Sequence, residues 1–336
     1  MLQEDTRWTK GQAGKRATLS ERLRFSGSFF ALWKAADIVA SRPAAPFLAM
    51  QCLVGIAALA FFDTILAKRP CRLLVLANDH SPVATAIMIA ARRHGITTVY
   101  RQHAPVTPEF PPLIVDVALL YDAASCAAYR SAGEAYPDLL VGRETRMIVL
   151  PPFSENCKLI ACRGKSRVVG LCLSLVWREA AVIAAIHNLL ASGTVNRIIV
   201  RPHPANQIDL SPLLMIAGLE LDARGRSVAD FAKMLDCAIV PNSGVCIELL
   251  HHGVPVLYAA NMDALGHDLY GFASAGIVPD WTHRPLSDLD DARTFFDADW
   301  QERFSAFDAS ITHDLADLRA EARAALNDYL AEPRAE

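Results

Sequence analysis

Two short segments carry residues that suit the binding of a phosphate group. In Arg201-Pro202-His203-Pro204, two prolines hold an arginine and a histidine rigidly, and both side chains form charge-assisted hydrogen bonds with phosphates. Asn242-Ser243-Gly244 precedes a predicted helix, whose first N–H groups and positive dipole end favour an anion. Glu248, one turn into that helix, can accept hydrogen bonds from ribose hydroxyls. The more ordinary explanations are a strand terminator with a solvated arginine and a plain helix start with a first-turn glutamate.

Two further segments carry residues that suit proton transfer. Arg101-Gln102-His103-Ala104-Pro105 places a histidine, the usual side chain for moving a proton near neutral pH, after a predicted strand. Asn78-Asp79-His80-Ser81 gathers four polar residues after another predicted strand. Ser81 or Asp79 has a simpler role as the cap of the next helix, and the backbone of a proline-rich loop can satisfy His103. Both interpretations stay open, and we favour a functional role for His103.

The other polar patterns indicate no further chemistry. His251-His252 ends a predicted helix, where we expect an exposed pair that compensates the helix dipole. The sequence has no glycine-rich dinucleotide fingerprint, no Walker-type phosphate loop and no nucleophile elbow. These absences argue against a nicotinamide enzyme, a P-loop NTPase and an α/β-hydrolase.

The candidate segments need a scaffold that brings them together, and a strand–helix alternation predicts one. Short apolar runs typical of buried strands alternate with segments of helical spacing. In the first half of the chain, predicted strands cover 72–77, 97–100, 115–121 and 146–150, and predicted helices cover 27–68, 81–94 and 123–132.

The pattern stops over the irregular residues 153–166 and then restarts. Predicted strands then cover 168–174, 196–200, 237–240 and 255–258, and predicted helices cover 178–190, 227–235 and 245–252. Because strands that alternate with helices form parallel sheets, we predict an α/β fold with two doubly wound, Rossmann-like domains. Ligands of such sheets bind beyond the carboxyl ends of the strands. Ser174, at the end of a predicted strand, therefore joins the candidate residues.

The same pattern predicts the domain organisation. Residues 1–26 are expected to be a loose basic arm, 27–152 an N-terminal domain and 167–285 a C-terminal domain. Residues 287–331 have helical spacing and polar faces, and we expect them to brace the two domains. The irregular linker near 153–166 would let the domains close on a ligand.

Composition and charge limit the function classes. The chain has 336 residues, 52% of them hydrophobic, and a formal net charge of -3, so no basic field favours nucleic acid. None of the eight cysteines forms a CxxC pair and no zinc-type spacing occurs, so we expect free thiols, no metal site and a reducing cytoplasm. Residues 1–20 carry no apolar segment of the signal-peptide kind.

One apolar stretch raises the question of a membrane. Residues 44–62 are almost wholly apolar and nearly as many as the roughly 20 that a membrane-spanning helix needs. Pro46, Gln51 and the Asp63 that follows favour instead a helix packed under a sheet. We expect the buried helix and keep weak contact with a membrane as the alternative.

Taken together, the motifs resemble those of a known group of enzymes. The Gln-His loop, the Arg-Pro-His-Pro segment and Asn-Ser-Gly…Glu followed by His-Gly-Val-Pro-Val-Leu-Tyr resemble bacterial surface and capsule polysaccharide glycosyltransferases of the GT-B type. More distant similarity extends to CDP-glycerol glycerophosphotransferases, and polysialyltransferases share a His-Pro motif. The resemblance covers residues 70–260. Two departures are Gln-His-Ala where many relatives have Gln-His-Gly, and Asn242-Ser243-Gly244 in place of paired hydroxyl residues.

The resemblance implies an activity and a role for each candidate residue. A sugar would pass from a CMP-, CDP- or UDP-linked donor to a surface-polysaccharide or lipid-linked acceptor at the inner face of the inner membrane. A glycerophosphate-type transferase is the related activity that the resemblance also allows. No cofactor or metal is expected. His203 and Ser243 would hold the donor phosphates, Glu248 would read the ribose, and His103 would be the general base, with Asp79 as the second candidate. The wider predicted sets are Asp79 and His80 for catalysis, Arg201, Ser174, Asn242 and Gly244 for the donor, and Arg101, Gln102 and Asn78 for the acceptor.

Two other functions remain compatible with the sequence. A non-hydrolysing nucleotide-sugar 2-epimerase has the same fold and a similar Ser-Gly…Glu helix start, but it needs no acceptor. A GT-B-shaped sugar-binding protein would have lost the base. The partners expected in all three cases are nucleotide sugars or glycans, with no nucleic acid.

Overall fold

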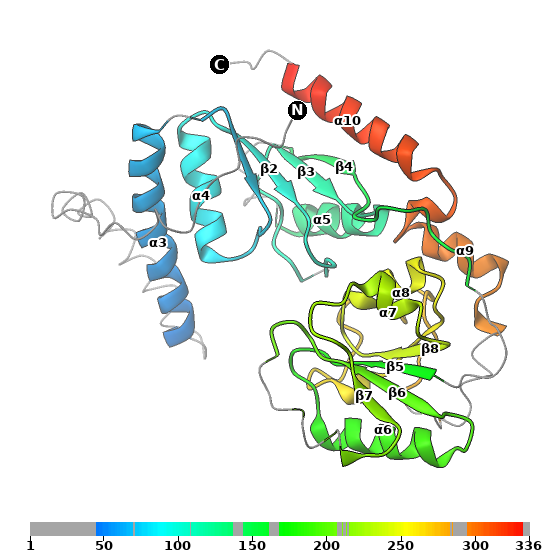
Figure 1. The fold of residues 1–336 in the computed structure, drawn as a ribbon. Coiled ribbons are helices and arrows are strands. Elements are labelled where there is room, and N and C mark those ends of the chain that lie inside the picture. The colour runs from blue at the N-terminus through cyan, green and yellow to red at the C-terminus, as the bar shows by residue number, and fades with distance from the viewer. Residues whose placement is uncertain are drawn as a thin grey trace. The chain divides into compact units, whose positions relative to one another are not determined.

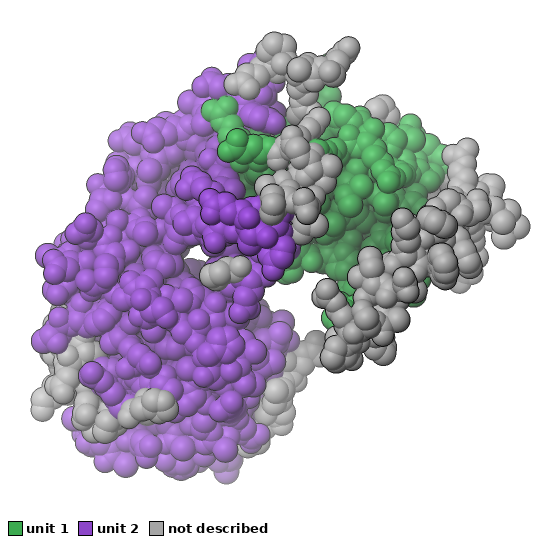
Figure 2. All heavy atoms as spheres, turned by 180° about the vertical axis from the view of Figure 1, so that it is seen from behind, with its two compact units in different colours: residues 1–101, 113–118, 140–146 green, residues 102–112, 119–139, 147–336 purple. Residues whose placement is uncertain are grey.

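The computed structural model (Figure 1) describes residues 45–69, 71–107, 109–136, 144–160, 168–206, 210, 213, 215–282, 284 and 294–331. The chain divides into two compact units, coloured separately in Figure 2. Unit 1 comprises residues 1–101, 113–118 and 140–146, and unit 2 comprises residues 102–112, 119–139 and 147–336.

The described part of unit 1 contains a pair of helices and two parallel strands. These are α3 (Ala45–Lys68), β1 (Leu73–Leu76), α4 (Pro82–Arg93) and β2 (Thr97–Arg101). The Ser81 side chain caps α4 by accepting a hydrogen bond from the Ala84 N–H. Soon after α4 the chain reaches Gly95, whose φ of 65° lies in the left-handed region that glycine adopts without strain. Helices α3 and α4 pack through a small apolar cluster that includes Leu66 and Ala90.

The first sheet has four strands in the order β1-β2-β3-β4. Its remaining strands are β3 (Val117–Leu120) and β4 (Arg146–Val149), and β1 pairs with β2 in parallel. Helix α5 (Ala123–Ala135) follows β3 and is capped by Asp122, which accepts a hydrogen bond from the Ser125 N–H.

The second sheet lies within unit 2 and is parallel throughout. Its strands are β5 (Val168–Cys172), β6 (Arg197–Arg201), β7 (Leu219–Leu221), β8 (Cys237–Val240) and β9 (Val256–Tyr258). They lie in the order β7-β6-β5-β8-β9, so the chain starts at the centre, builds one half and then crosses to the other. The connecting helices are α6 (Glu179–Ala191), α7 (Val228–Ala232) and α8 (Val245–His251). A reversal of this kind leaves a crevice at the strand ends in doubly wound sheets.

Both faces of the second sheet are buried. Val169 and Leu171 of β5 pack with α6 in one apolar cluster, and Cys172 packs with α8 in the other. Gly170 allows one close approach, because a Cβ there would lie 2.5 Å from a methyl carbon of Leu235. The rigid sheet fixes the positions of the loops that leave its strand ends.

The C-terminal elements complete the second core. They are α9 (Ala298–Ser305), η6 (Ala309–Ile311) and α10 (Leu315–Ala331). Trp300 and Phe304 of α9 are buried in the cluster that also holds α8. Asn156 of the linker accepts a hydrogen bond from the Leu315 N–H, so α10 is tied to the segment that follows β4.

The α/β class and the two parallel sheets predicted from the sequence are confirmed. The predicted strand and helix ends differ from the observed ones by a few residues at most, apart from the helix predicted to begin at residue 27, because residues 1–44 lie outside the described part. Strand β7 was not predicted, since its three residues, Leu219-Glu220-Leu221, are too few to show a period. The predicted arm 1–26 also lies outside the described residues, and the other domain limits stay predictions.

Residues 45–62 of the apolar stretch 44–62 belong to α3, and here the expectation of a buried helix is wrong. Residues 47–68 form the one described helix long and apolar enough to cross a membrane, and none of its most apolar window is buried. Phe47, Met50 and Leu53 are each more than half exposed. Among the described residues, α4 and β1 cover one side of α3, because a two-helix pair buries one stripe of each helix.

Candidate functional site

A pocket of about 960 Å³ lies within unit 2 and is lined mainly by loops that follow strands. Its walls come from residues 103–106 after β2, from 121–131 after β3, from 174–176 after β5, from 201–204 after β6 and from 242–248 after β8. Residues 263–272 close a further side. The carboxyl ends of parallel strands therefore supply most of this wall, as doubly wound folds favour.

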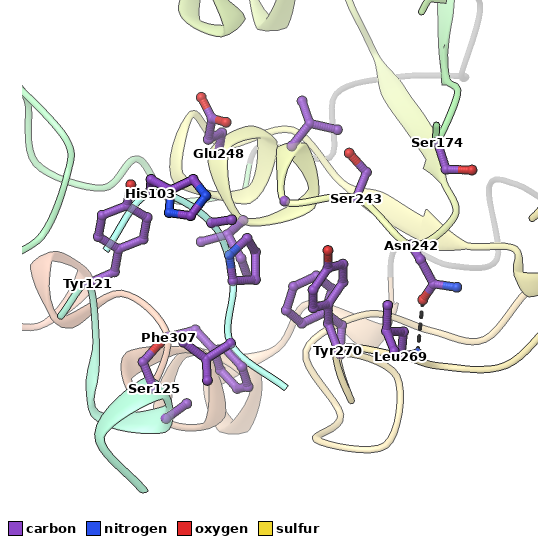
Figure 3. A pocket seen from close by; sticks show the side chains of 18 of the residues that line it. His103, Tyr121, Ser125, Ser174, Asn242, Ser243, Glu248, Leu269, Tyr270 and Phe307 are labelled. Atoms are coloured by element: carbon purple, nitrogen blue, oxygen red, sulfur yellow. Dashed lines mark hydrogen bonds between the residues drawn. The ribbon is translucent and has the colours of Figure 1, made fainter. Parts of the chain in front are cut away.

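The pocket brings together eight of the candidate residues proposed from the sequence. Figure 3 shows His103 at the same end as Tyr121 and Glu248, with Ser174 at the other end and Ser243 between them. The eight are His103, Ser174, Arg201, His203, Asn242, Ser243, Gly244 and Glu248. Asn78, Asp79, His80 and Arg101 belong to unit 1.

His203 is held in a defined tautomer by its own loop. Its Nδ1 accepts a hydrogen bond of 3.2 Å from the Ala205 N–H. A nitrogen that accepts a hydrogen bond carries no proton, so the imidazole proton lies on Nε2. His203 thus offers a neutral N–H donor at the end of β6.

Arg201 lines the pocket, but its positive charge is already compensated. Its guanidinium pairs with Asp222 and donates a hydrogen bond of 3.0 Å to the Arg226 backbone carbonyl. Only 18% of the side chain is exposed, and the guanidinium also lies over the Phe231 ring. This network suits Arg201 to hold the loop before His203 in place, with less charge available for a phosphate than the sequence suggested.

Asn242 and Ser174 differ in how far their hydrogen-bonding capacity is used. The Asn242 amide donates to the His267 carbonyl and accepts hydrogen bonds from the Tyr258 hydroxyl and the Leu269 N–H (Figure 3 marks the last). Ser174 is 3% exposed, and no described group bonds to its hydroxyl. A buried polar group without a partner costs free energy, so Ser174 is suited to receive a ligand atom.

Just before α8, the chain passes close to residues 102–105, the histidine loop that carries His103. Gly244 lies so close to this loop that a Cβ there would come within 2.8 Å of the Pro105 ring. Ser243 precedes it and lines the same wall. Glycine is needed here for the close approach, and it keeps His103 near the first turn of α8.

Glu248 lines the pocket, and other protein groups surround its carboxyl closely. Desolvation raises the pKa of this carboxyl above its ordinary value, and the charges of Arg201 and His251 partly offset the effect. The raised pKa indicates a carboxylate short of donors, which ligand hydroxyls can supply.

Gln102 is not a pocket residue, although the sequence placed it beside the acceptor. It is 1% exposed, its Nε2 donates to the Ala104 carbonyl and the Ser125 hydroxyl, and its Oε1 accepts from the Tyr121 N–H. Every hydrogen-bonding group of the amide faces the protein. Gln102 therefore fixes the backbone on both sides of His103, which is itself exposed.

In unit 1, the segment 78–81 satisfies its polar groups locally. The Asn78 Oδ1 accepts from the N–H groups of His80 and Ser81, and Ser81 caps α4. The His80 Nδ1 lies 2.9 Å from an oxygen of the buried Asp79 carboxylate. The capping role considered for Ser81 is what the structure shows.

The sequence analysis missed two acidic residues of the pocket. Asp122 lies two residues after the end of β3, and burial raises the pKa of its carboxyl to about 6, although the Ser125 hydrogen bonds lower it. Asp263 follows η4 (Ala260–Met262); it is 1% exposed, and its Oδ2 has no partner among the described groups. The strand-end criterion would have found Asp122, but no local pattern marks Asp263.

One wall of the pocket is apolar and made of small side chains. Ala124, Ala127, Ala128 and Ser131 of α5 recur at three- and four-residue intervals, which places them on one face of the helix. Phe153 and Phe307 line the pocket as well. This wall offers contact area to a ligand but few hydrogen bonds.

Comparison with known proteins shows the fold and no closer relationship. No protein-family model and no curated protein matches the sequence. A solved structure of CalG4, the calicheamicin glycosyltransferase, superposes with a TM-score of 0.53 at 12% identity and covers 83% of this chain and 79% of that one.

Two other solved structures give lower scores. A putative UDP-N-acetylglucosamine 2-epimerase from Listeria monocytogenes has a TM-score of 0.49 at 11% identity, and the match covers 84% of this chain and 80% of that one. A chain of the GtfA/B complex has a TM-score of 0.48 and 10% identity, and this protein spans 60% of the length of that chain. The two parallel sheets and the match to CalG4 establish a Rossmann-like fold of the GT-B type.

Proposed function

We propose that the protein is a nucleotide-sugar-dependent glycosyltransferase whose acceptor carries an apolar, lipid-like part. The observation that supports it most is the gathering, in one strand-end pocket, of hydrogen-bond donors suited to a phosphate and of an exposed histidine. His203 and Ser243 supply the donors, and His103 is the histidine.

On the donor side, the His203 Nε2–H and the Ser243 hydroxyl bind the phosphates of the leaving nucleotide. Hydrogen bonds from the protein stabilise the charge that develops there as the sugar departs. The unpaired Ser174 hydroxyl and Glu248 take the hydroxyl groups of the ribose or the sugar. Arg201 acts through the loop that carries His203.

In the reaction step, the acceptor hydroxyl oxygen forms a bond to the anomeric carbon. The bond between that carbon and the phosphate oxygen breaks, and the nucleotide leaves with the electron pair. His103 takes the hydroxyl proton, since it is exposed in the pocket and Gln102 holds its loop. The main contribution of the protein is to position the reactants in a site that excludes water.

The acceptor is inferred from the α5 wall. A polysaccharide without a lipid needs many hydrogen bonds from the protein. The side chains of Asp122, Ser125 and Asn242 already form hydrogen bonds with other protein groups and offer few more. The exposed face of small residues on α5 suits an apolar chain or ring next to the reacting hydroxyl. A lipid-linked acceptor has both an apolar chain and a hydroxyl that can react.

The exposed face of α3 supports a peripheral location on a membrane. Phe47, Met50 and Phe61 present apolar surface that no described residue covers, and surfaces of this kind mark membrane or protein contacts. We expect the protein to sediment with anionic lipid vesicles, and replacement of Phe47 and Phe61 by serine to reduce the bound fraction.

The test of the proposed activity is donor consumption with and without an acceptor. The protein is incubated with CMP-, CDP- and UDP-linked sugars, alone and with polyprenyl-linked glycans, and nucleotide release is followed. A transferase releases nucleotide at a rate that depends on the acceptor. Conversion of the sugar without acceptor would establish an epimerase, and binding without conversion would leave a sugar-binding protein.

A further inference from the structure

A cysteine, a histidine and an aspartate from three distant parts of unit 2 meet in its interior. Potential ligand atoms of Cys157, His251 and Asp308 all lie within 4.8 Å of one another. Cys157 belongs to the linker after β4, His251 ends α8 and Asp308 caps η6. The expectation that His251 and His252 form an exposed pair is wrong for His251, which is 1% exposed because it packs under the linker.

From this geometry we propose that Cys157, His251 and Asp308 form a site for one zinc ion. Sulfur, imidazole nitrogen and carboxylate oxygen are the three protein ligand types that zinc takes. Magnesium and calcium prefer oxygen alone. Three protein ligands leave a fourth position for water.

The ring of His251 is positioned by Asp308 and Phe153. The Nδ1 lies 2.6 Å from the Asp308 Oδ2, while the buried Nε2 has no hydrogen-bond partner among the described groups. Phe153 stacks on the ring at 3.6 Å and keeps water from one face. Nδ1 is therefore the ring nitrogen that faces the Asp308 side of the cluster.

A second set of contacts orients the proposed ligands. The Asp308 Oδ1 accepts hydrogen bonds from the Ser310 N–H and hydroxyl, which leaves Oδ2 on the side of the cluster. The Cys157 N–H donates to the Ser310 hydroxyl, and the Lys158 N–H donates to the His251 carbonyl. Supporting contacts of this kind are typical of metal sites.

The charges also suit a divalent cation. Zinc binds cysteine as the thiolate, so the Cys157 thiol must give up its proton. A zinc ion displaces that proton, and one thiolate, one carboxylate and a neutral imidazole then balance its two charges. Cys157 is only half-buried, which gives the ion a route from solvent.

Occupation of the site would tie the linker to α8 and to the C-terminal segment. Helix α8 begins two residues after Ser243 and carries Glu248 about one turn before His251, so the ion would support the pocket wall from outside the pocket, and its binding can be measured without any assay of activity.

The test uses the full chain, stripped of metal and titrated with Co²⁺. We expect one equivalent to bind with a thiolate-to-cobalt absorption band in the near ultraviolet, and one equivalent of Zn²⁺ to remove the band. Cys157→Ser should lose the band and weaken Zn²⁺ binding at least about 10-fold, and Asp308→Asn should weaken it comparably. Cys71→Ser, which removes an exposed thiol in unit 1, is the matched control and should bind as the wild type does.

The melting temperature gives a second readout, because a ligand that binds only the folded state stabilises it. Zn²⁺ should raise it for the wild type and Cys71→Ser but not for Cys157→Ser. The proposal is overturned if no near-ultraviolet band appears, or if Cys157→Ser binds one equivalent of Zn²⁺ with unchanged affinity. Neither result depends on the transferase activity.

Discussion

The strand-end segments of the two units have similar residue types but differ in how their polar groups are used. In unit 1, residues 78–81 bond mainly to one another and cap α4. In unit 2, Ser174 and Asp263 keep a buried polar atom without a described partner, and both line the pocket. The unused hydrogen-bonding capacity, rather than the residue type, distinguishes a binding segment from a structural one.

The strongest test of this comparison replaces one candidate general base in each unit. His103→Ala should lower turnover by roughly 10²–10⁴-fold, the usual contribution of a positioned base, with little change in donor affinity. His103→Gln should not restore it, because an amide cannot take the proton. Turnover and nucleotide affinity are measured on the same samples.

The matched variant in unit 1 is Asp79→Asn. It should turn over almost as fast as the wild type if residues 78–81 are structural. If Asp79→Asn is inactive and His103→Ala is normal, the base is Asp79 and the comparison fails.

A second prediction concerns Asp122, a buried carboxyl at the end of β3. Its folded pKa of about 6 lies above the reference value of 3.8, so the folded state binds the proton more tightly than the unfolded state. Its contribution to stability is therefore full below pH 4 and is lost as the pH rises to 6. Asp122→Asn keeps an acceptor for the Ser125 N–H and removes the titration.

Between pH 4 and pH 7, the wild type should therefore lose up to about 3 kcal/mol of unfolding free energy relative to Asp122→Asn. Urea unfolding at both pH values measures it. A difference that does not change with pH would show that burial does not perturb this carboxyl.

The third prediction compares a pocket side chain that is hydrogen-bonded to the protein with one whose hydroxyl has no described partner. Asn242→Ala breaks three hydrogen bonds and should lower the unfolding free energy by about 2–3 kcal/mol. Ser174→Ala removes a buried hydroxyl without a partner, so stability should stay equal or rise, while donor affinity falls by about 1 kcal/mol. Loss of stability in Ser174→Ala would mean that the hydroxyl has a structural partner.

A fourth prediction concerns Gly244→Ala. The added Cβ lies 2.8 Å from the Pro105 ring, so the histidine loop must shift by a few tenths of an ångström. We expect turnover to fall about 10-fold, as small misplacements of reacting groups reduce rates. Donor affinity should be nearly unchanged, and Gly55→Ala in α3, where an added Cβ would meet nothing closer than 3.6 Å, is the control for a glycine replacement outside the pocket.

Much of the fold followed from the sequence, because buried parallel strands such as β5 and β8 are apolar runs bounded by helices with clear periodicity. The site followed in part, since Arg201, His203 and Ser243 stand directly after strands. Sequence position could not show that Arg201 is paired with Asp222 or that Gln102 faces inward, because both depend on partners about 20 residues away. The buried state of His251 depends on Asp308, 57 residues further on.

The most direct test of the proposed function is nucleotide binding followed by melting temperature, with His203→Ala beside the wild type. We predict that at least one of CMP, CDP, UDP and GDP raises the melting temperature of the wild type, and that His203→Ala weakens its binding by about 1.5–3 kcal/mol. No stabilisation by any of the four nucleotides, or an equal stabilisation of His203→Ala, would contradict the assignment of the pocket to a nucleotide-sugar donor.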